Sequence, residues 1–191
     1  MGYNGTIFVL SGPAGVGKNS IMQHVLAKKN ILRQMPTATT RAIRPGEQEG
    51  REHYFVTLDQ FRKMIADGAL IEYQENYPGM FYGTPRQQLQ RALEAGDKII
   101  ADIDVKGASE LKRAFPDNVV VIFVAPPSLD DLETRLNTRG NMSEAEIAER
   151  LKRAPWELDF ARQSDYQVVN DDLEASVEAV CKIICERLHN N

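Results

Sequence analysis

A chain of 191 residues with 42% hydrophobic content is long enough to bury the core of one ordinary domain with a small inserted lobe, and too short for two domains of typical size. Its 23 basic and 27 acidic side chains give a formal net charge of −4, which argues against a surface that binds duplex nucleic acid. The sequence has neither a bilayer-spanning stretch nor a secretion signal, so we expect a cytoplasmic protein that binds no membrane.

The first element is the apolar run "TIFVL" at residues 6–10, which predicts a strand buried on both faces. A glycine-rich turn, "GPAGVGK", and then a helical pattern follow it directly. This context predicts a P-loop, because glycines let backbone N–H groups turn toward an anion while Lys18 adds a full positive charge. The alternative, a tight connection without a ligand, explains neither the lysine nor the glycines. We expect a nucleoside triphosphate to be bound by Gly12, Pro13, Ala14, Gly15, Val16, Gly17, Lys18, Asn19 and Ser20.

Asn19 stands where the P-loop pattern has a Ser or Thr whose hydroxyl binds magnesium. A carboxamide oxygen can replace that hydroxyl directly, through a water molecule, or not at all. Ser20 lies one position too late to substitute automatically. We expect Mg²⁺ as the cofactor, with Asn19 as a candidate ligand.

Residues 35–84 differ in character from the rest and predict an inserted lobe. Turn residues cluster in "RPGEQEGREHYF" and "NYPGMFYGTP", with a short helix at residues 57–66 between them. Arg41 and Arg44 lie three positions apart beside a Pro-Gly turn, where two guanidinium groups can converge on one phosphate. A solvated charge pair is the alternative interpretation.

The same lobe carries a candidate reader of a purine base. Glu72 follows an apolar pair, and Tyr82 and Thr84 flank a glycine. A buried carboxylate can accept the N1–H and exocyclic amine of guanine, whereas adenine presents no such pair of donors. Glu72 therefore favours guanine, unless it is only a surface charge at a helix end and Tyr82 only packs.

The remaining elements alternate between helix and strand. "TPRQQLQRALEAG" predicts a helix capped at Thr84, with Pro85 at its first position. Apolar runs at residues 98–104, 119–125 and 166–170 predict three further buried strands, and a helix begins at Ser128. Ser143 and Glu146 form a capping box for a charged helical segment that Pro155 disturbs, which we interpret as a lid.

This alternation predicts an α/β fold, a P-loop doubly wound parallel sheet with helices on both faces. We expect a single domain whose core comprises residues 1–34, 85–139 and 156–191, with the lobe at 35–84 and the lid at 140–155. Cys181 and Cys185 lack a nearby Cys or His pair at metal-ligand spacing, so we expect neither a disulfide nor a zinc site. We interpret both as small apolar residues on the buried face of the last helix.

The motifs "GPAGVGK", "TTRAIRPGE", "FYGTP", "DIDVKGA", "APPS", "RGNMSEAEIAERL" and "VNDD", in this order, resemble those of guanylate kinases over essentially the whole chain. The resemblance implies transfer of the γ-phosphoryl group of Mg-ATP to GMP, giving ADP and GDP. It implies that the GMP phosphate is held by Arg41, Arg44 and Tyr82. The guanine side would be contacted by Thr37, Glu72, Thr84 and Asp104.

The resemblance also assigns the groups around the transferred phosphoryl group. It implies that Asp102 lies near the metal and the phosphates, and that Arg135, Arg139 and Arg150 lie in or beside the closing lid. With Lys18 and Arg41, these arginines are the candidate catalytic residues. Metal ligation is expected from Asn19 and Asp102.

Two departures from the family pattern concern the acceptor site. The family usually has a phosphate-binding Tyr at the third place after the Gly of "GREHYF", where this chain has His53 followed by Tyr54. Either the His53 imidazole donates to the phosphate, or Tyr54 reaches in after a local shift. The loop "NYPGMFYG" is one residue longer than the common pattern, which leaves the correspondence of residues 74–79 open.

These departures keep two other functions in view. One is a P-loop kinase with a different phosphorylated acceptor. The other is a non-catalytic, guanylate-kinase-like binding module, against which the intact P-loop and the lid arginines argue. The sequence does not indicate an oligomeric state.

Overall fold

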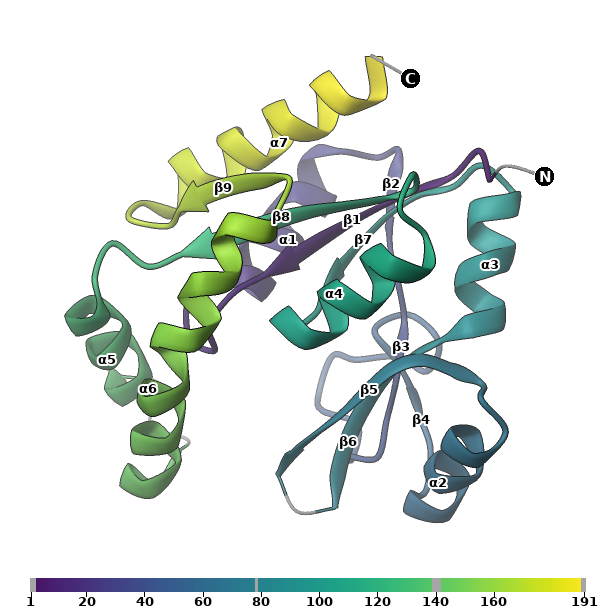
Figure 1. The fold of residues 1–191 in the computed structure, drawn as a ribbon, viewed down its shortest axis with the longest axis horizontal. Coiled ribbons are helices and arrows are strands. Elements are labelled where there is room, and N and C mark those ends of the chain that lie inside the picture. Colours follow the sequence, from purple (N-terminus) through teal and green to yellow (C-terminus); the bar gives the residue numbers. More distant parts are fainter. Residues whose placement is uncertain (1–2, 78, 139–141, 190–191) are drawn as a thin grey trace. The chain divides into compact units, whose positions relative to one another are not determined.

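The computed structural model describes residues 3–77, 79–138 and 142–189 (Figure 1). The chain divides into two compact units, each described here by itself. Unit 1 comprises Met1–Ile7, Ile31–Ala101 and Ser109–Val119, and unit 2 comprises Phe8–Asn30, Asp102–Ala108 and Val120–Asn191. Among the described residues, no helix is long and apolar enough to cross a bilayer.

The four predicted strands and one unpredicted strand, β2, form a five-stranded sheet in the order β2-β7-β1-β8-β9, which can be followed in Figure 1. Its strands are β1 (Thr6–Ser11), β2 (Leu32–Gln34), β7 (Lys98–Asp102), β8 (Val119–Ala125) and β9 (Tyr166–Val169). The pairs β2–β7 and β8–β9 are parallel, and β1 is buried along its whole length. The prediction that β9 is buried was wrong, because only Val168 of its four residues is buried. The predicted α/β class is confirmed. Ligands of such sheets bind at the carboxyl ends of the strands, where the strand order reverses.

The helices assigned wholly to unit 2 are α1 (Lys18–Lys28), α5 (Leu129–Thr138), α6 (Glu144–Asp159) and α7 (Leu173–His189), with a 3₁₀ turn at Phe160–Gln163. Helix α4 (Val105–Ala114) follows β7. An ion pair between Lys28 and Glu174 joins α1 to α7. On α7, Cys181 is buried as expected, but Cys185 is only half-buried and accepts a hydrogen bond from Lys29 Nζ at 3.1 Å.

Helix α6 begins as predicted, with the capping box of Ser143 and Glu146, but it does not end near Pro155. The helix continues through Pro155 to Asp159. Pro155 lies on the exposed side of α6, where water can satisfy the carbonyl that lacks its helical partner. Pro155 was predicted to disturb the helical pattern, but the structure includes it within α6.

Helix α3 (Arg86–Glu94) starts later than predicted, because Thr84 belongs to a strand. Thr84 is fully buried, and its hydroxyl donates to Glu72 Oε1 at 2.6 Å instead of capping the helix. Pro85 takes the N-cap position with extended backbone and makes no side-chain cap. The predicted cap at Thr84 was wrong because a partner distant in sequence uses the hydroxyl.

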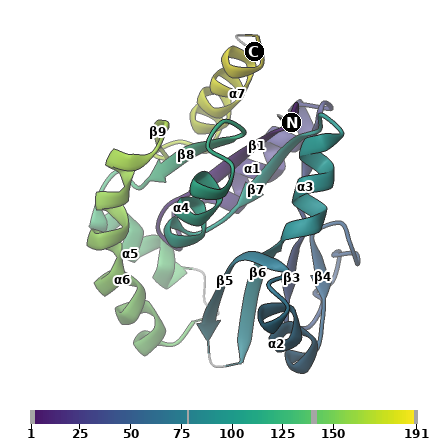
Figure 2. The same cartoon turned by 45° about the vertical axis from the view of Figure 1, so that its right-hand side comes forward.

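Unit 1 contains a four-stranded sheet, in the order β4-β3-β6-β5, that the sequence did not predict (Figure 2). Its strands are β3 (Thr37–Thr39), β4 (His53–Phe55), β5 (Leu70–Tyr77) and β6 (Met80–Pro85). The predicted helix α2 (Leu58–Ala66) carries the expected capping box of Thr57 and Gln60. Phe61 of α2 packs with Ala38 and Leu70, so this helix covers one face of the sheet.

Candidate active site

The P-loop follows β1 and leads into α1, as predicted. Gly12 has a φ of 135°, and a Cβ at this position would lie 2.2 Å from the Val124 carbonyl oxygen of β8. Gly17, the N-cap of α1, has a φ of 100°, and its Cβ would lie 2.4 Å from Asn170 Nδ2. Both positions require glycine because the loop passes so close to its neighbours.

Asn170, just beyond β9, holds the P-loop in place. Its buried side chain donates from Nδ2 to the Val16 carbonyl at 2.7 Å. Ser176 Oγ in turn donates to Asn170 Oδ1 at 3.0 Å. This clamp is the structural role of the Asn in the "VNDD" motif, and it preorganises the loop for an anion.

Lys18 lies across the P-loop. Its Nζ donates to the carbonyl oxygens of Gly12 at 2.8 Å and Pro13 at 3.1 Å. The same ammonium group lies 3.7 Å from Asp102 Oδ1, at the end of β7. The lysine side chain is 11% exposed, so its charge is compensated mainly by protein oxygens.

The donors beside Lys18 suit magnesium. Asp102 supplies a carboxylate that is 31% exposed, and Asn19 lies exposed in the first turn of α1. Among the described residues there is no cluster of three or more His, Cys, Asp or Glu that could hold a metal alone. One carboxylate and one amide oxygen, completed by nucleotide phosphates and water, fit the way Mg²⁺ binds in phosphoryl-transfer enzymes.

Of the lid arginines, Arg135 of α5 donates to the Asp171 carbonyl at 3.4 Å, and Arg150 lies on α6. Arg139 lies outside the described residues.

Glu157, which the sequence did not single out, lies buried on α6. The positive charges of Lys18 and Arg150 are close enough to influence its pKa. Arg153, one turn earlier, lies 3.5 Å from Glu157 Oε1. Burial is the largest effect on Glu157 and raises its pKa above the ordinary value. The positive charges of Arg153, Lys18 and Arg150 oppose this rise, and the carboxylate of Asp104 adds to it.

Five of the predicted GMP-binding residues share one face of the four-stranded sheet: Thr37, His53, Glu72, Tyr82 and Thr84. The register pairs Thr37 with His53, and Thr39 with Tyr82. Side chains alternate along a strand, so these residues lie on the face opposite Ala38, which packs against α2. Glu72 and Thr84 belong to the same face, where their side chains are hydrogen-bonded. Tyr54 pairs with Ala38 in the register and belongs to the other face.

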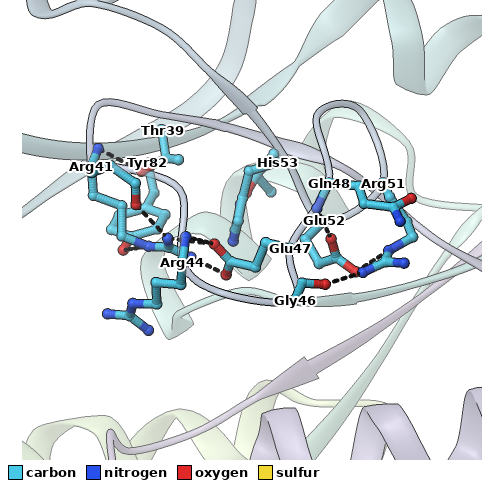
Figure 3. Close-up of polar contacts among 12 residues, drawn as sticks. Thr39, Arg41, Arg44, Gly46, Glu47, Gln48, Arg51, Glu52, His53 and Tyr82 are labelled. Carbon is cyan, nitrogen blue, oxygen red and sulfur yellow. Dashed lines mark hydrogen bonds and ion pairs between the residues drawn. The ribbon is translucent and has the colours of Figure 1, made fainter.

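Arg41 is buried, and its guanidinium donates four hydrogen bonds, one of them to the Ala42 carbonyl at 2.9 Å (Figure 3). Its NH1 and NH2 groups donate to the Glu47 carboxylate at 2.7 and 2.5 Å, and Nε donates to the Tyr82 hydroxyl at 3.0 Å. This pairing with Arg41 lowers the pKa of Glu47 to about 2, despite the opposing effect of burial. The sequence did not predict the pairing of Glu47 with Arg41, because a glutamate in a turn is usually a solvated charge.

Arg44 does not join Arg41 in this structure. Its backbone N–H donates to Glu47 Oε2 at 2.8 Å, while its side chain is exposed and points away from the Arg41–Glu47 pair in Figure 3. The structure thus brings Arg41, Tyr82 and His53 together but leaves the Arg44 guanidinium apart. Asp104 lies at the start of α4, where Oδ1 accepts the backbone N–H groups of Lys106 and Gly107, both at 2.9 Å.

Comparison with known proteins matches a sequence model described as Guanylate kinase to residues 4–187. The chain belongs to the guanylate kinase family. This confirms the family, and the kind of enzyme, predicted from the sequence: an ATP:GMP phosphotransferase.

Several relatives are similar over nearly their whole length. The guanylate kinase of Salinibacter ruber is 44% identical over 172 residues, covering 90% of this chain and 91% of that protein. That of Synechocystis sp. is 42% identical over 182 residues, covering 95% and 94%. The crystal structure of guanylate kinase from Anaplasma phagocytophilum, 31% identical, superposes with a TM-score of 0.76 over 97% of this chain and 87% of that one. A gluconokinase from Sinorhizobium meliloti 1021, 14% identical with a TM-score of 0.55, shares only the fold.

Replacing Glu157 by Gln tests whether the buried carboxylate charge lowers the stability of the folded protein. A raised carboxyl pKa in the folded state means that stability is lost as pH rises above the ordinary value of 4.5. We therefore expect Glu157→Gln to unfold at a higher temperature at pH 7, by roughly 2–4 °C if about 1 kcal/mol is gained. The difference should vanish near pH 4.

Glu149→Gln, an exposed substitution on the same helix, is the matched control and should leave the melting temperature unchanged at both pH values. A melting temperature of Glu157→Gln that is unchanged or lower at pH 7 would contradict the electrostatic cost.

Proposed function

We propose that this guanylate kinase binds the triphosphate of Mg-ATP in the P-loop of unit 2 and GMP on the open face of the four-stranded sheet of unit 1. The observation that carries the acceptor assignment is the joint placement of two recognition groups on that face. One is the Glu72–Thr84 pair for the base, and the other is the Arg41–Tyr82 pair for the phosphate.

In this proposal the Glu72 carboxylate recognises the guanine base. The carboxylate is buried, at 8% exposure, and Thr84 Oγ1 orients one of its oxygens. A carboxylate oriented in this way accepts the N1–H and the amine of guanine through charge-assisted bonds. Adenine, which has an unprotonated N1, would face the carboxylate with an acceptor, and the buried charge would lose its partners. Thr37 and Asp104 complete the guanine side by family resemblance.

Arg41 and Tyr82 hold the acceptor phosphate, and Glu47 positions Arg41. The pair with Glu47 fixes the guanidinium before GMP arrives, so little side-chain entropy is lost on binding. We assign the role of the missing family tyrosine to His53 and not to Tyr54. The pairing of His53 with Thr37, on the face that we propose for GMP, supports this assignment. Arg44, exposed at the turn, would approach the phosphate only after its side chain reorients.

The chemistry requires alignment and charge neutralisation more than covalent help. A loose, in-line phosphoryl transfer spreads charge over the oxygens of the transferred group, and cations that match this charge lower the barrier. Lys18 exchanges its bonds to the loop carbonyls for phosphate oxygens, and the P-loop N–H groups bind the same anion. Arg135, Arg139 and Arg150 contribute further positive charge and exclude water, which would otherwise accept the phosphoryl group.

Magnesium, held by Asp102 and Asn19, supplies neutralisation of the ATP phosphates when bound. A neutral carboxamide is a workable oxygen ligand, and α1 presents it in the turn that begins at Lys18. No residue is assigned as a general base, because the attacking GMP phosphate oxygen is already an anion.

The substitution Glu72→Gln tests guanine recognition. The amide retains the size of the carboxylate but has one acceptor oxygen and no charge, so GMP affinity should fall at least tenfold, about 1.4 kcal/mol. ATP affinity should remain within about twofold, because ATP binds elsewhere. Calorimetric titration of each nucleotide measures both constants, and an equal loss for GMP and ATP would exclude Glu72 as the reader of the base.

The substitution Asn19→Thr tests the metal ligand. We expect the hydroxyl to lower the magnesium concentration that gives half-maximal rate several-fold, because it restores the usual P-loop ligand. Titration of ATP affinity with and without magnesium gives a second readout, and only the value with magnesium should improve. No change in either quantity would show that Asn19 takes no part in holding the metal.

A further inference from the structure

His53 occupies the position of the family tyrosine. It contacts one residue assigned to the guanine side of the acceptor site and one residue assigned to the phosphate side. Its Nδ1 lies 2.8 Å from Thr37 Oγ1, on the residue assigned to the guanine side. Its ring contacts Tyr82 edge-on, with 5.8 Å between ring centroids, on the residue assigned to the phosphate. Figure 3 shows the ring beside the Arg41–Glu47 pair. The half-buried imidazole, on the edge strand β4, thus contacts one residue assigned to each side of the acceptor site.

Charged groups face His53 from several elements. Arg41 follows β3, and Glu47 and Glu52 belong to the turn segment before β4. Burial, followed by the positive charge of Arg41, holds the pKa of His53 below its ordinary value of 6.5. Glu47 and Glu52 oppose that shift. Tyr82 of β6 adds a neutral hydroxyl that is already an acceptor for Arg41.

The hydrogen bond to Thr37 decides where a proton can be added. In the neutral ring that suits an anion, Nδ1 accepts from the Thr37 hydroxyl, and Nε2 carries the N–H that is left to donate to a phosphate. Protonation then occurs at Nδ1, and the Thr37 hydroxyl changes from donor to acceptor without breaking the contact. Both protonation states therefore present a donor, and the protonated state adds a full positive charge.

Resting on the proposed function, we propose that His53 takes up a proton at Nδ1 when the GMP phosphate binds beside Arg41 and Tyr82, so that the phosphate is bound by an imidazolium and GMP affinity is linked to pH. The phosphate brings negative charge next to a ring whose pKa burial and Arg41 together had lowered, and this reverses the local balance. A tyrosine at this position stays neutral across the same pH range and cannot produce the linkage. The histidine therefore makes acceptor binding dependent on pH near neutrality.

The linkage has a definite sign. Because the pKa of His53 is higher in the complex than in the unliganded protein, GMP affinity is greatest at low pH and falls as pH rises through the value in the complex. The phosphate of GMP has its own second pKa near 6, so the effect of His53 is separated from it by working above about pH 7.

Histidine NMR on the unaltered protein is the primary test, since the chain has only 3 histidines. The imidazole signals of His53, His24 and His189 are titrated without ligand, with saturating GMP, and with guanosine. We expect GMP to raise the pKa of His53 by about one unit or more, and guanosine to leave it unchanged because it lacks the phosphate. His24 and His189, whose Nδ1 atoms contact carbonyls of their own helices, are internal controls that should not move.

Calorimetry at pH 7.5 in two buffers of different ionisation enthalpy counts the protons taken up. The unaltered protein should bind GMP with fractional proton uptake, whereas His53→Tyr and His53→Gln should show an uptake near zero. A pKa of His53 that is unchanged or lowered by GMP, or proton uptake that persists in His53→Gln, would overturn the inference. GMP that is bound and phosphorylated without protonation of His53 would leave the proposed function intact, while failure to bind GMP would overturn both.

Discussion

Both candidate binding sites depend on one constraint: a buried cation that is to bind a phosphate needs an anionic partner while no nucleotide is bound. Lys18 and Arg41, whose side chains are 11% and 6% exposed, meet this need with Asp102 and Glu47. A cation left unpaired at such depth would cost several kcal/mol. Each partner also fixes the orientation of its cation before a nucleotide binds. These local positive charges let the chain bind highly charged anions although its own net charge is −4.

The two pairs respond differently to a ligand because their geometry differs. Arg41 and Glu47 form a bidentate pair, and the pKa of about 2 for Glu47 keeps the carboxylate charged until the solution is strongly acidic. The stability contributed by this lowered pKa is present above the ordinary value and is lost as pH falls toward 2. Lys18 and Asp102, by contrast, are 3.7 Å apart, and the lysine is held by loop carbonyls that a phosphate can displace. A fixed arginine for the acceptor and an exchangeable lysine for the donor suit the two roles.

Local patterns predicted the P-loop, the buried strands and the reaction, because their signals lie within a few consecutive residues. The strand β1, the glycines and Lys18 form one short stretch, and the strands β1, β7 and β8 are mainly apolar runs. The short strand β2 has no such run and was not predicted. The four-stranded sheet was missed because β3 and β4 have only 3 residues each, and their pairing joins residues distant in the chain. Thr84 was misplaced for the same reason, since its partner Glu72 lies on another strand.

Glu157 and Glu47 were missed for a different reason: their charge suggested a solvated position. Because Pro155 is unfavourable inside a helix, the sequence did not predict the last turn of α6, on which Glu157 is buried. Because Glu47 lies in a turn, the sequence did not predict its ion pair with Arg41. Burial of a carboxylate is a property of the folded chain and leaves no local pattern. His53 was visible as a departure from the family pattern, but only the register of β3 and β4 gave it a partner.

The most direct test of this account is ADP release from Mg-ATP with GMP, AMP, CMP and UMP offered separately, using Lys18→Met as the blank. The account predicts that GMP stimulates release selectively, while AMP, CMP and UMP give rates near the blank. Equal stimulation by AMP would contradict the assignment of Glu72 as the guanine reader. Silence with all four nucleotides, in a protein that binds ATP, would contradict the assignment of the acceptor site.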